Sequence, residues 1–154
     1  NIPLGDQCAD VLLSLFGFPV YESFLRVLKN NGKLIIANAG PLHLIELRRV
    51  IYPEVNVTEF SELATAEAAG FKWEDSQTVK YQIPMMNQGD LSQLLLMTPH
   101  LFRATQAGRD RALQLESLSV TVDVEFHILK LQQNLIRMYL KLLNSLWVKY
   151  TIAV

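Results

Sequence analysis

Short apolar runs and longer amphipathic stretches alternate along the first third of the chain, and their order predicts an α/β unit. Asp10–Phe16 is an almost continuous apolar run, short enough to be a strand that is buried on both faces. Val20–Lys29 places its apolar residues along one face of a helix, and the polar turn Asn30-Asn31-Gly32 ends that helix. Lys33–Ala37 then reads as the next strand. Two strands joined by one helix predict a parallel, right-handed crossover unit.

The remaining pattern predicts more helices and two later strands. We expect a strand over Ser76–Met86, a turn at Asn87–Asp90, a loop over Tyr52–Glu59, and helices over Pro41–Ile51, Ser61–Ala69, Leu91–Leu101 and Gln106–Leu118. The clearest period lies in Val120–Leu131, where apolar residues alternate with Thr121, Asp123, Glu125 and His127. Such alternation is typical of a half-buried, antiparallel strand with its polar side chains outward. The fold class expected is therefore α/β, with parallel strands that end in an antiparallel one.

Composition narrows the function only slightly. A chain of 154 residues with 50% hydrophobic residues can bury one sizeable core, so one domain is the first expectation. The net charge of −1 gives no basic field that would by itself indicate nucleic-acid binding. One cysteine, Cys8, cannot build a disulfide framework or a cysteine-rich zinc site, which favours a cytoplasmic location. Two isolated histidines, His100 and His127, are expected at the surface and do not predict a metal site.

Two segments carry a family resemblance. Arg26–Tyr52 (RVLKNNGKLIIANAGPLHLIELRRVIY) and, further on, Leu94–Ala104 (LLLMTPHLFRA) resemble the bacterial ribosomal RNA guanine-N1 methyltransferases. The resemblance covers about Ile2 to Gln132. It implies transfer of a methyl group from S-adenosylmethionine to a guanine of large-subunit rRNA. It also implies the C-terminal half of a Rossmann-like class I methyltransferase sheet.

The same family begins with a small zinc-binding lobe and a glycine-rich cofactor strand, and this sequence contains neither. We therefore expect residues 1–132 to be a partial S-adenosylmethionine-dependent methyltransferase domain that is inactive alone, with zinc in the lobe that is missing here and none in this chain. Residues 133–154 depart from the family. The apolar spacing in Asn134–Val154 predicts an amphipathic helix. We expect this helix to cover apolar surface of the core and not to lie on a membrane. The spacing also leaves open a tail that has no role.

The resemblance assigns cofactor binding to Gly40, Pro41 and His43. His43 matches the histidine of the family's Gly-Pro-x-His-Leu motif, which lines the cofactor pocket. Spacing alone favours a plainer role, in which the histidine packs or caps locally in the first turn of its helix.

Substrate binding is expected at the segment that follows the first strand. In Leu15–Pro19, the rings of Phe16 and Phe18 could stack on a flipped guanine, and Gly17 would let the backbone approach the edge of the base. The alternative is packing in the core, which we expect for at least one of these phenylalanines.

Charged residues supply further candidates. Arg103, which follows Met97-Thr98-Pro99, and Arg49 could bind RNA phosphates, whereas Arg109 and Arg111 better fit a solvated helix face. Asp6 and Asp10 resemble family acids at the start of the strand, and neither is assigned as a general base. No residue in the sequence identifies the acceptor of the guanine N1 proton.

Two other functions stay open, namely a class I methyltransferase that acts on a small molecule and a non-catalytic interaction protein. The strand at Asp10–Phe16 should leave an apolar edge free, and such an edge is a template for pairing with a second copy. A homodimer through this edge is therefore expected.

Overall fold

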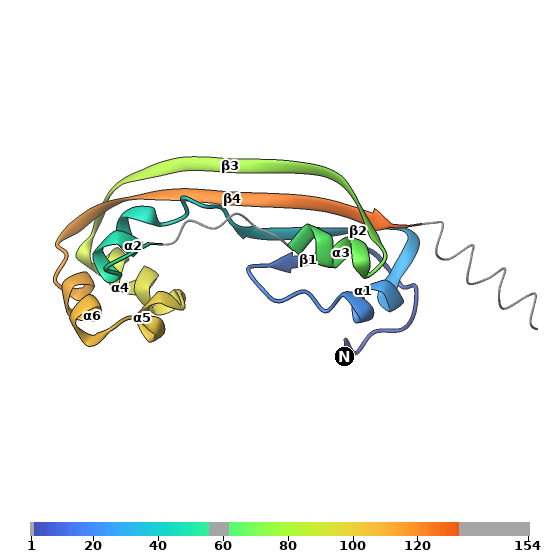
Figure 1. Cartoon of the computed structure of the whole chain (residues 1–154), viewed down its shortest axis with the longest axis horizontal. Helices are drawn as coiled ribbons and strands as arrows, with labels where there is room; N and C mark the ends of the chain where they lie inside the picture. Colours follow the sequence, from blue (N-terminus) through green and yellow to red (C-terminus); the bar gives the residue numbers. More distant parts are fainter. Residues whose placement is uncertain (1, 56–61, 133–154) are drawn as a thin grey trace, which may run out of the picture. The chain divides into compact units, whose positions relative to one another are not determined.

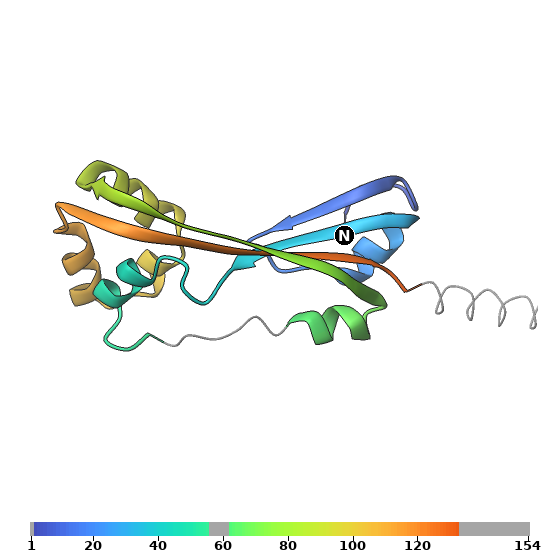
Figure 2. The ribbon, with the colours of Figure 1, turned by 90° about the horizontal axis from the view of Figure 1, so that it is seen from above.

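The computed structural model describes residues 2–55 and 62–132, which form an α/β fold (Figure 1). Its sheet is four-stranded, in the order β1-β2-β4-β3. The strands are β1 (Ala9–Leu15), β2 (Leu28–Ala39), β3 (Phe71–Asn87) and β4 (Ser117–Leu131). β1 and β2 point the same way, and β4 runs opposite to β2 (Figure 2). The predicted fold class, with parallel strands that end in an antiparallel one, is confirmed. The expected helix at Asn134–Val154 lies outside the described residues.

Six helices connect these strands in the described part of the chain: α1 (Tyr21–Val27), α2 (Ile45–Ile51), α3 (Glu62–Ala68), α4 (Gln88–Met97), α5 (His100–Arg103) and α6 (Gln106–Leu113). The turn predicted at Asn87–Asp90 is wrong, because Asn87 is the N-cap of α4 and accepts a hydrogen bond from the backbone N–H of Asp90 at 3.0 Å. The helix predicted after it is interrupted at Thr98-Pro99. The helix predicted over Gln106–Leu118 ends early, since β4 already begins at Ser117.

The predicted polar turn at Asn30-Asn31-Gly32 is also wrong. α1 ends at Val27, and β2 begins at once with Leu28 in an extended conformation. Gly32 lies inside the strand, where a Cβ atom would come within 2.6 Å of the Leu28 side chain and 3.1 Å of the Ala9 carbonyl oxygen. The glycine is therefore explained by close packing and not by a turn.

The described chain divides into two compact units. Among the described residues, the first contains 2–36, 62–76 and 127–132, and the second contains 37–55 and 77–126. In the first unit, the aromatic ring of Phe71 is fully buried and lies 5.8 Å from that of Tyr21. In the second unit, α2, α4 and α6 enclose a core with the start of β4, formed by Leu44, Leu47, Ile51, Leu91, Leu95, Ala104, Ala112 and Val120.

The strand β1 is at the edge of the sheet and is not buried on both faces, as the apolar run had predicted. Val11, Leu13 and Leu15 are 51–62% exposed, whereas Ser14 on the other side of the strand is buried. No neighbouring strand of the described chain pairs with the outer edge of β1, because β2 is its only neighbour in the sheet. The expected free apolar edge is therefore present.

We expect this edge to pair with a second copy of the chain. An antiparallel pair centred on Leu12 would place Val11 opposite Leu13 and Asp10 opposite Ser14 of the other copy, so that no like charges meet. Sedimentation equilibrium should show a dimer, and Leu13→Lys should shift it toward monomer because a charge on an edge strand blocks pairing. Leu113→Lys, on the exposed side of α6, is the matched control. A monomer at high concentration would contradict this expectation.

The alternation in β4 exists, but two residues on its polar side are buried. Asp123 and His127 are 2% and 7% exposed, although both were predicted to point outward. The residues around the carboxyl end of β2 cover Asp123, and this contact builds the candidate site.

Candidate functional site

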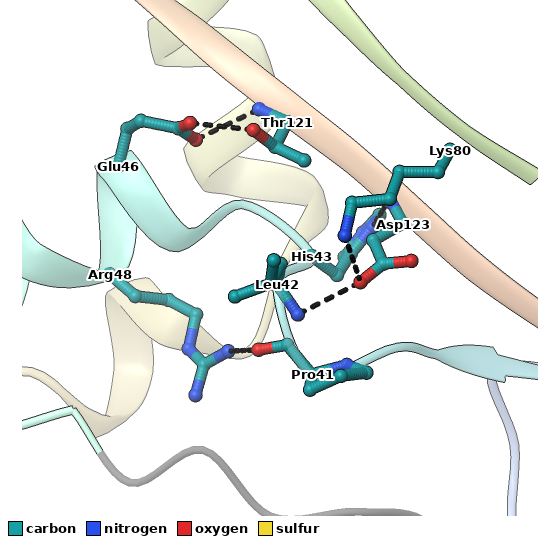
Figure 3. A network of polar contacts seen from close by, with 8 residues as sticks. All are labelled: Pro41, Leu42, His43, Glu46, Arg48, Lys80, Thr121 and Asp123. Atoms are coloured by element: carbon teal, nitrogen blue, oxygen red, sulfur yellow. Dashed lines mark hydrogen bonds and ion pairs between the residues drawn. The ribbon is translucent and has the colours of Figure 1, made fainter.

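The site is a turn formed by residues 40–44, which follows β2 and is bound to β4 by backbone hydrogen bonds. The N–H of Gly40 donates to the carbonyl oxygen of Asp123, and the N–H of Leu44 donates to that of Thr121, each at 2.8 Å. Between them, the N–H of Leu42 donates to Oδ2 of Asp123 at 3.0 Å (Figure 3). The helix predicted from Pro41 begins only at Ile45, because Leu44 has a left-handed backbone conformation that an α-helix cannot contain.

The carboxylate of Asp123 is at the centre of this arrangement. It is almost fully buried, and Nζ of Lys80, on the neighbouring strand β3, lies 3.8 Å from Oδ2. A Cβ atom on Gly40 would come within 2.7 Å of the Asp123 carboxyl carbon. Only glycine therefore allows the turn to approach the carboxylate this closely.

The ring of His43 is fixed by the same strand. Its Nδ1 accepts a hydrogen bond from the backbone N–H of Asp123 at 3.2 Å, so the proton of the neutral ring lies on Nε2. Burial lowers the pKa of His43 below its usual value; the Asp123 carboxylate partly opposes this, and the positive charge of Arg48 adds to it. His43 is consequently neutral at pH 7.

The start of α2 is held from both sides. The guanidinium of Arg48 donates to the carbonyl oxygen of Pro41 at 3.0 Å, and the Glu46 carboxylate accepts from the N–H and hydroxyl of Thr121 at 2.8 and 2.6 Å. Burial alone would raise the pKa of Glu46, but the hydrogen bonds from Thr121 and the charge of Arg49 leave it lowered. Leu44 adopts a left-handed conformation with φ of 51°, and its buried side chain compensates for that strain.

A second group of side chains lies in the same unit, where α2 ends and α5 begins. The hydroxyl of Tyr52 and Nδ1 of His100 are 3.0 Å apart, and their rings meet edge to face. Burial lowers the pKa of His100, and the neighbouring Arg48, His43 and Arg103 lower it further. His100 is thus half-buried and not a surface residue, and the cationic side chains of Arg48 and Arg103 lie near it.

The predicted substrate residues are exposed. Phe16 and Phe18 are 59% and 90% exposed, so the expectation that one of them packs in the core is wrong. Gly17 is exposed and Pro19 is half-buried. This segment belongs to the first unit, whereas His43 and Arg103 belong to the second. Arg103 is exposed on α5.

Other charged candidates have structural roles. Arg111 is not simply solvated, because its guanidinium donates to the carbonyl oxygens of Val50 at 3.0 Å and Ile51 at 3.4 Å and so caps α2. Asp6 pairs with Arg26 and Asp10 with Lys29, each at 2.8 Å. Arg49 stays exposed, and Arg109 is half-buried.

Sequence reasoning missed Asp123, Lys80 and Tyr52. No local signal distinguishes Asp123 from Glu125, which occupies an equivalent polar position in the same alternation. Within 2–55 and 62–132, no group of three or more His, Cys, Asp or Glu side chains could hold a metal ion. Over the same ranges, no helix has the length and apolar character needed to cross a membrane.

Comparison with known proteins gives one match in sequence. The chain is 32% identical over 127 residues to a Bacillus subtilis (strain 168) protein named "Putative 23S rRNA (guanine-N(1)-)-methyltransferase YxjB". The aligned region covers 82% of this chain but only 45% of that relative. This chain is a homologue of part of that protein. No protein-family model matches the chain.

Solved structures give weaker similarities. A "putative methyltransferase" from Bacillus halodurans C-125 aligns over 84% of this chain and 67% of its own, with a TM-score of 0.46 and 15% identity. The YcgJ protein of Bacillus subtilis aligns over the same shares with a TM-score of 0.37 and 16% identity.

Proposed function

We propose that this chain is part of a methyltransferase that transfers a methyl group from S-adenosylmethionine to N1 of a guanine in large-subunit rRNA. The observation that carries the proposal is the 127-residue sequence match to a protein named for this activity. The match is supported by the resemblance in Gly40-Pro41 with His43, which was recognised from the residues alone. An rRNA substrate would place the protein in the cytoplasm.

S-adenosylmethionine, when bound, supplies a methyl group on a positively charged sulfur. Guanine N1 would form the new N–CH₃ bond as the S–CH₃ bond breaks, and the N1 proton would leave to water or to a backbone carbonyl. Such a displacement depends mainly on alignment of the three atoms. The role proposed for the 40–44 turn is to hold one wall of the cofactor site rigidly, with a neutral His43 whose Nε2 carries a proton.

The fit of that turn to the cofactor can be judged from its own contacts. The N–H of Gly40, the carbonyl oxygen of Pro41 and Nδ1 of His43 all have partners within the chain. They therefore position the turn, and we propose that the ring of His43, held by β4, contacts the cofactor. The sequence has no glycine-rich nucleotide turn, so we expect the 154 residues by themselves to bind S-adenosylmethionine weakly.

The test is methyl transfer by the natural polypeptide that contains these residues. Incubation with tritiated S-adenosylmethionine and unmodified large-subunit rRNA should label the RNA, and nuclease digestion should recover the label as 1-methylguanosine. His43→Ala should weaken cofactor binding about tenfold in titration calorimetry, because one hydrogen bond in a partly buried site is lost. Lys72→Ala, an exposed residue of the first unit, should leave the affinity unchanged.

Label that appears only in small molecules would overturn the rRNA assignment and favour a metabolite methyltransferase. Equal affinities for the His43→Ala and Lys72→Ala variants would return His43 to a purely local role.

A further inference from the structure

Next to the candidate site, the short helix α5 presents an aromatic ring and a cation to solvent. Phe102 is 77% exposed, Arg103 is exposed beside it, and Met97, at the end of α4, is 84% exposed. Large apolar side chains that gather at the surface of a folded protein indicate a binding surface more often than isolated ones do.

This exposure occurs on an anchored helix. The other side of α5 is fixed by His100, which contacts Tyr52, and by Ala104, which is 6% exposed and belongs to the core of the second unit. The N–H groups of Arg103 and Ala104 donate to the carbonyl oxygens of Pro99 and His100 at 3.2 and 3.0 Å. The backbone of Phe102 and Arg103 is therefore held in place, which reduces the conformational entropy that is lost when a ligand binds.

The local charge is positive. Arg48 and Arg103 both lie close enough to His100 to lower its pKa. Between Met97 and Gln106 there is no acidic residue, and none of the ion pairs between described residues involves Arg103. A partner that fits this surface carries a flat apolar group and a negative charge next to each other. A nucleotide of a single-stranded or looped nucleic acid has both, since its base is unstacked and its phosphate adjoins it.

We propose that Phe102 and Arg103 form an RNA contact, in which the ring of Phe102 stacks on an unpaired base and the guanidinium of Arg103 binds the adjacent phosphate. This inference rests on the proposed function for the choice of RNA, and it adds a stacking residue outside the Phe16–Pro19 segment.

The test is binding of a fluorescently labelled RNA hairpin with a guanine-containing loop to the natural polypeptide, measured by anisotropy without S-adenosylmethionine. Phe102→Ala should weaken the Kd about tenfold, and Phe102→Trp should retain it, because stacking needs the aromatic face. Arg103→Ala should also weaken binding and should reduce the slope of log K against log salt by about one. Leu96→Ala, which removes an exposed aliphatic side chain of α4, is the matched control.

A second readout reports the phosphate directly. A phosphate next to Arg103 should raise the pKa of His100, which NMR titration of its ring protons would detect on addition of the hairpin. Inorganic phosphate alone should have a much smaller effect at the same concentration, and a DNA hairpin of the same sequence measures whether the ribose contributes. The groups that face His100 in this titration are Tyr52, Arg48, His43 and Arg103.

Equal Kd values for wild type, Phe102→Ala and Arg103→Ala would overturn the inference. So would an equal loss in Phe102→Ala and Leu96→Ala, since that would indicate a general apolar contact. Competition by perfectly paired duplex RNA as effective as that by the hairpin would also contradict stacking.

The two proposals fail separately. If Phe102→Ala leaves methyl transfer to rRNA unchanged, only the proposed Phe102 contact is refuted. If RNA binding depends on stacking but no methyl group is transferred, only the proposed activity is refuted.

Discussion

Replacing Asp123 with alanine should lower the free energy of unfolding by about 3 kcal/mol, the largest effect that we expect from a single polar side chain in the described chain. The change removes the acceptor of the Leu42 N–H and leaves space beside Gly40, within a buried environment. The ion pair with Lys80 contributes little to this figure, because the lysine is half-exposed and 3.8 Å away. Urea denaturation measures the loss, and hydrogen exchange at the amides of residues 40–44 should become faster.

Asp123→Asn is the control for this prediction. Its side-chain oxygen can still accept from Leu42, so the expected loss is only about 1 kcal/mol. If the asparagine variant lost as much stability as the alanine variant, the negative charge and not the hydrogen bond would be what holds the turn. If neither variant changed exchange at residues 40–44, the backbone bonds to β4 would be sufficient.

Gly108→Ala should destabilise the second unit by at least about 2 kcal/mol, although glycine-to-alanine changes inside helices usually stabilise. The added Cβ would overlap the carbonyl oxygen of Ile51, which is backbone and cannot rotate away. α6 would have to move from α2, and this would also disturb the hydrogen bonds from Arg111 to the last carbonyls of α2. Thermal unfolding followed by circular dichroism should show the loss.

Gly89→Ala provides the comparison within the same unit. Gly89 lies in the first turn of α4, and the nearest atom to its added Cβ is a side-chain oxygen of Asn87 at 3.2 Å. That oxygen accepts the N-cap hydrogen bond from Asp90 and needs to give only slightly, so the change in stability should stay within about 1 kcal/mol of zero. Similar changes in stability for the two variants would show that the close approach of α6 to α2 does not govern Gly108.

Local sequence was sufficient for the order and type of most elements. Two strands were identified from the alternation in Val120–Leu131 and from the apolar run Asp10–Phe16. Both patterns are local, because the spacing of apolar side chains reflects the geometry of the strand itself. Boundaries were less accurate where polar residues had tertiary roles. Asn30-Asn31-Gly32 has the composition of a turn but continues β2, where Gly32 packs against the Leu28 side chain and against the carbonyl oxygen of Ala9, which is distant in sequence.

The site was predicted in part. The residues of the Gly40-Pro41-x-His43 motif were recognised from sequence and lie together in the 40–44 turn, but their partner Asp123 could not be found locally. The same holds for Lys80, which lies on β3, and for the contact of Tyr52 with His100 on α5. The exposure of Phe102 also depends on how His100 and Ala104 anchor α5. A helix of four residues is too short for its apolar spacing to predict which side faces solvent.

The separation in sequence between the turn and its partner has a consequence for synthesis. Leu42 and Asp123 are 81 residues apart. Because the chain is made from the N-terminus at about 5–20 residues per second, Gly40 to Leu44 would wait at least about 4 seconds before β4 exists. During that interval the N–H groups of the turn have no protein acceptor in β4, and contacts of such long range form slowly even afterwards. Pulse-labelling of nascent chains should therefore find the motif exposed until β4 has been released from the ribosome.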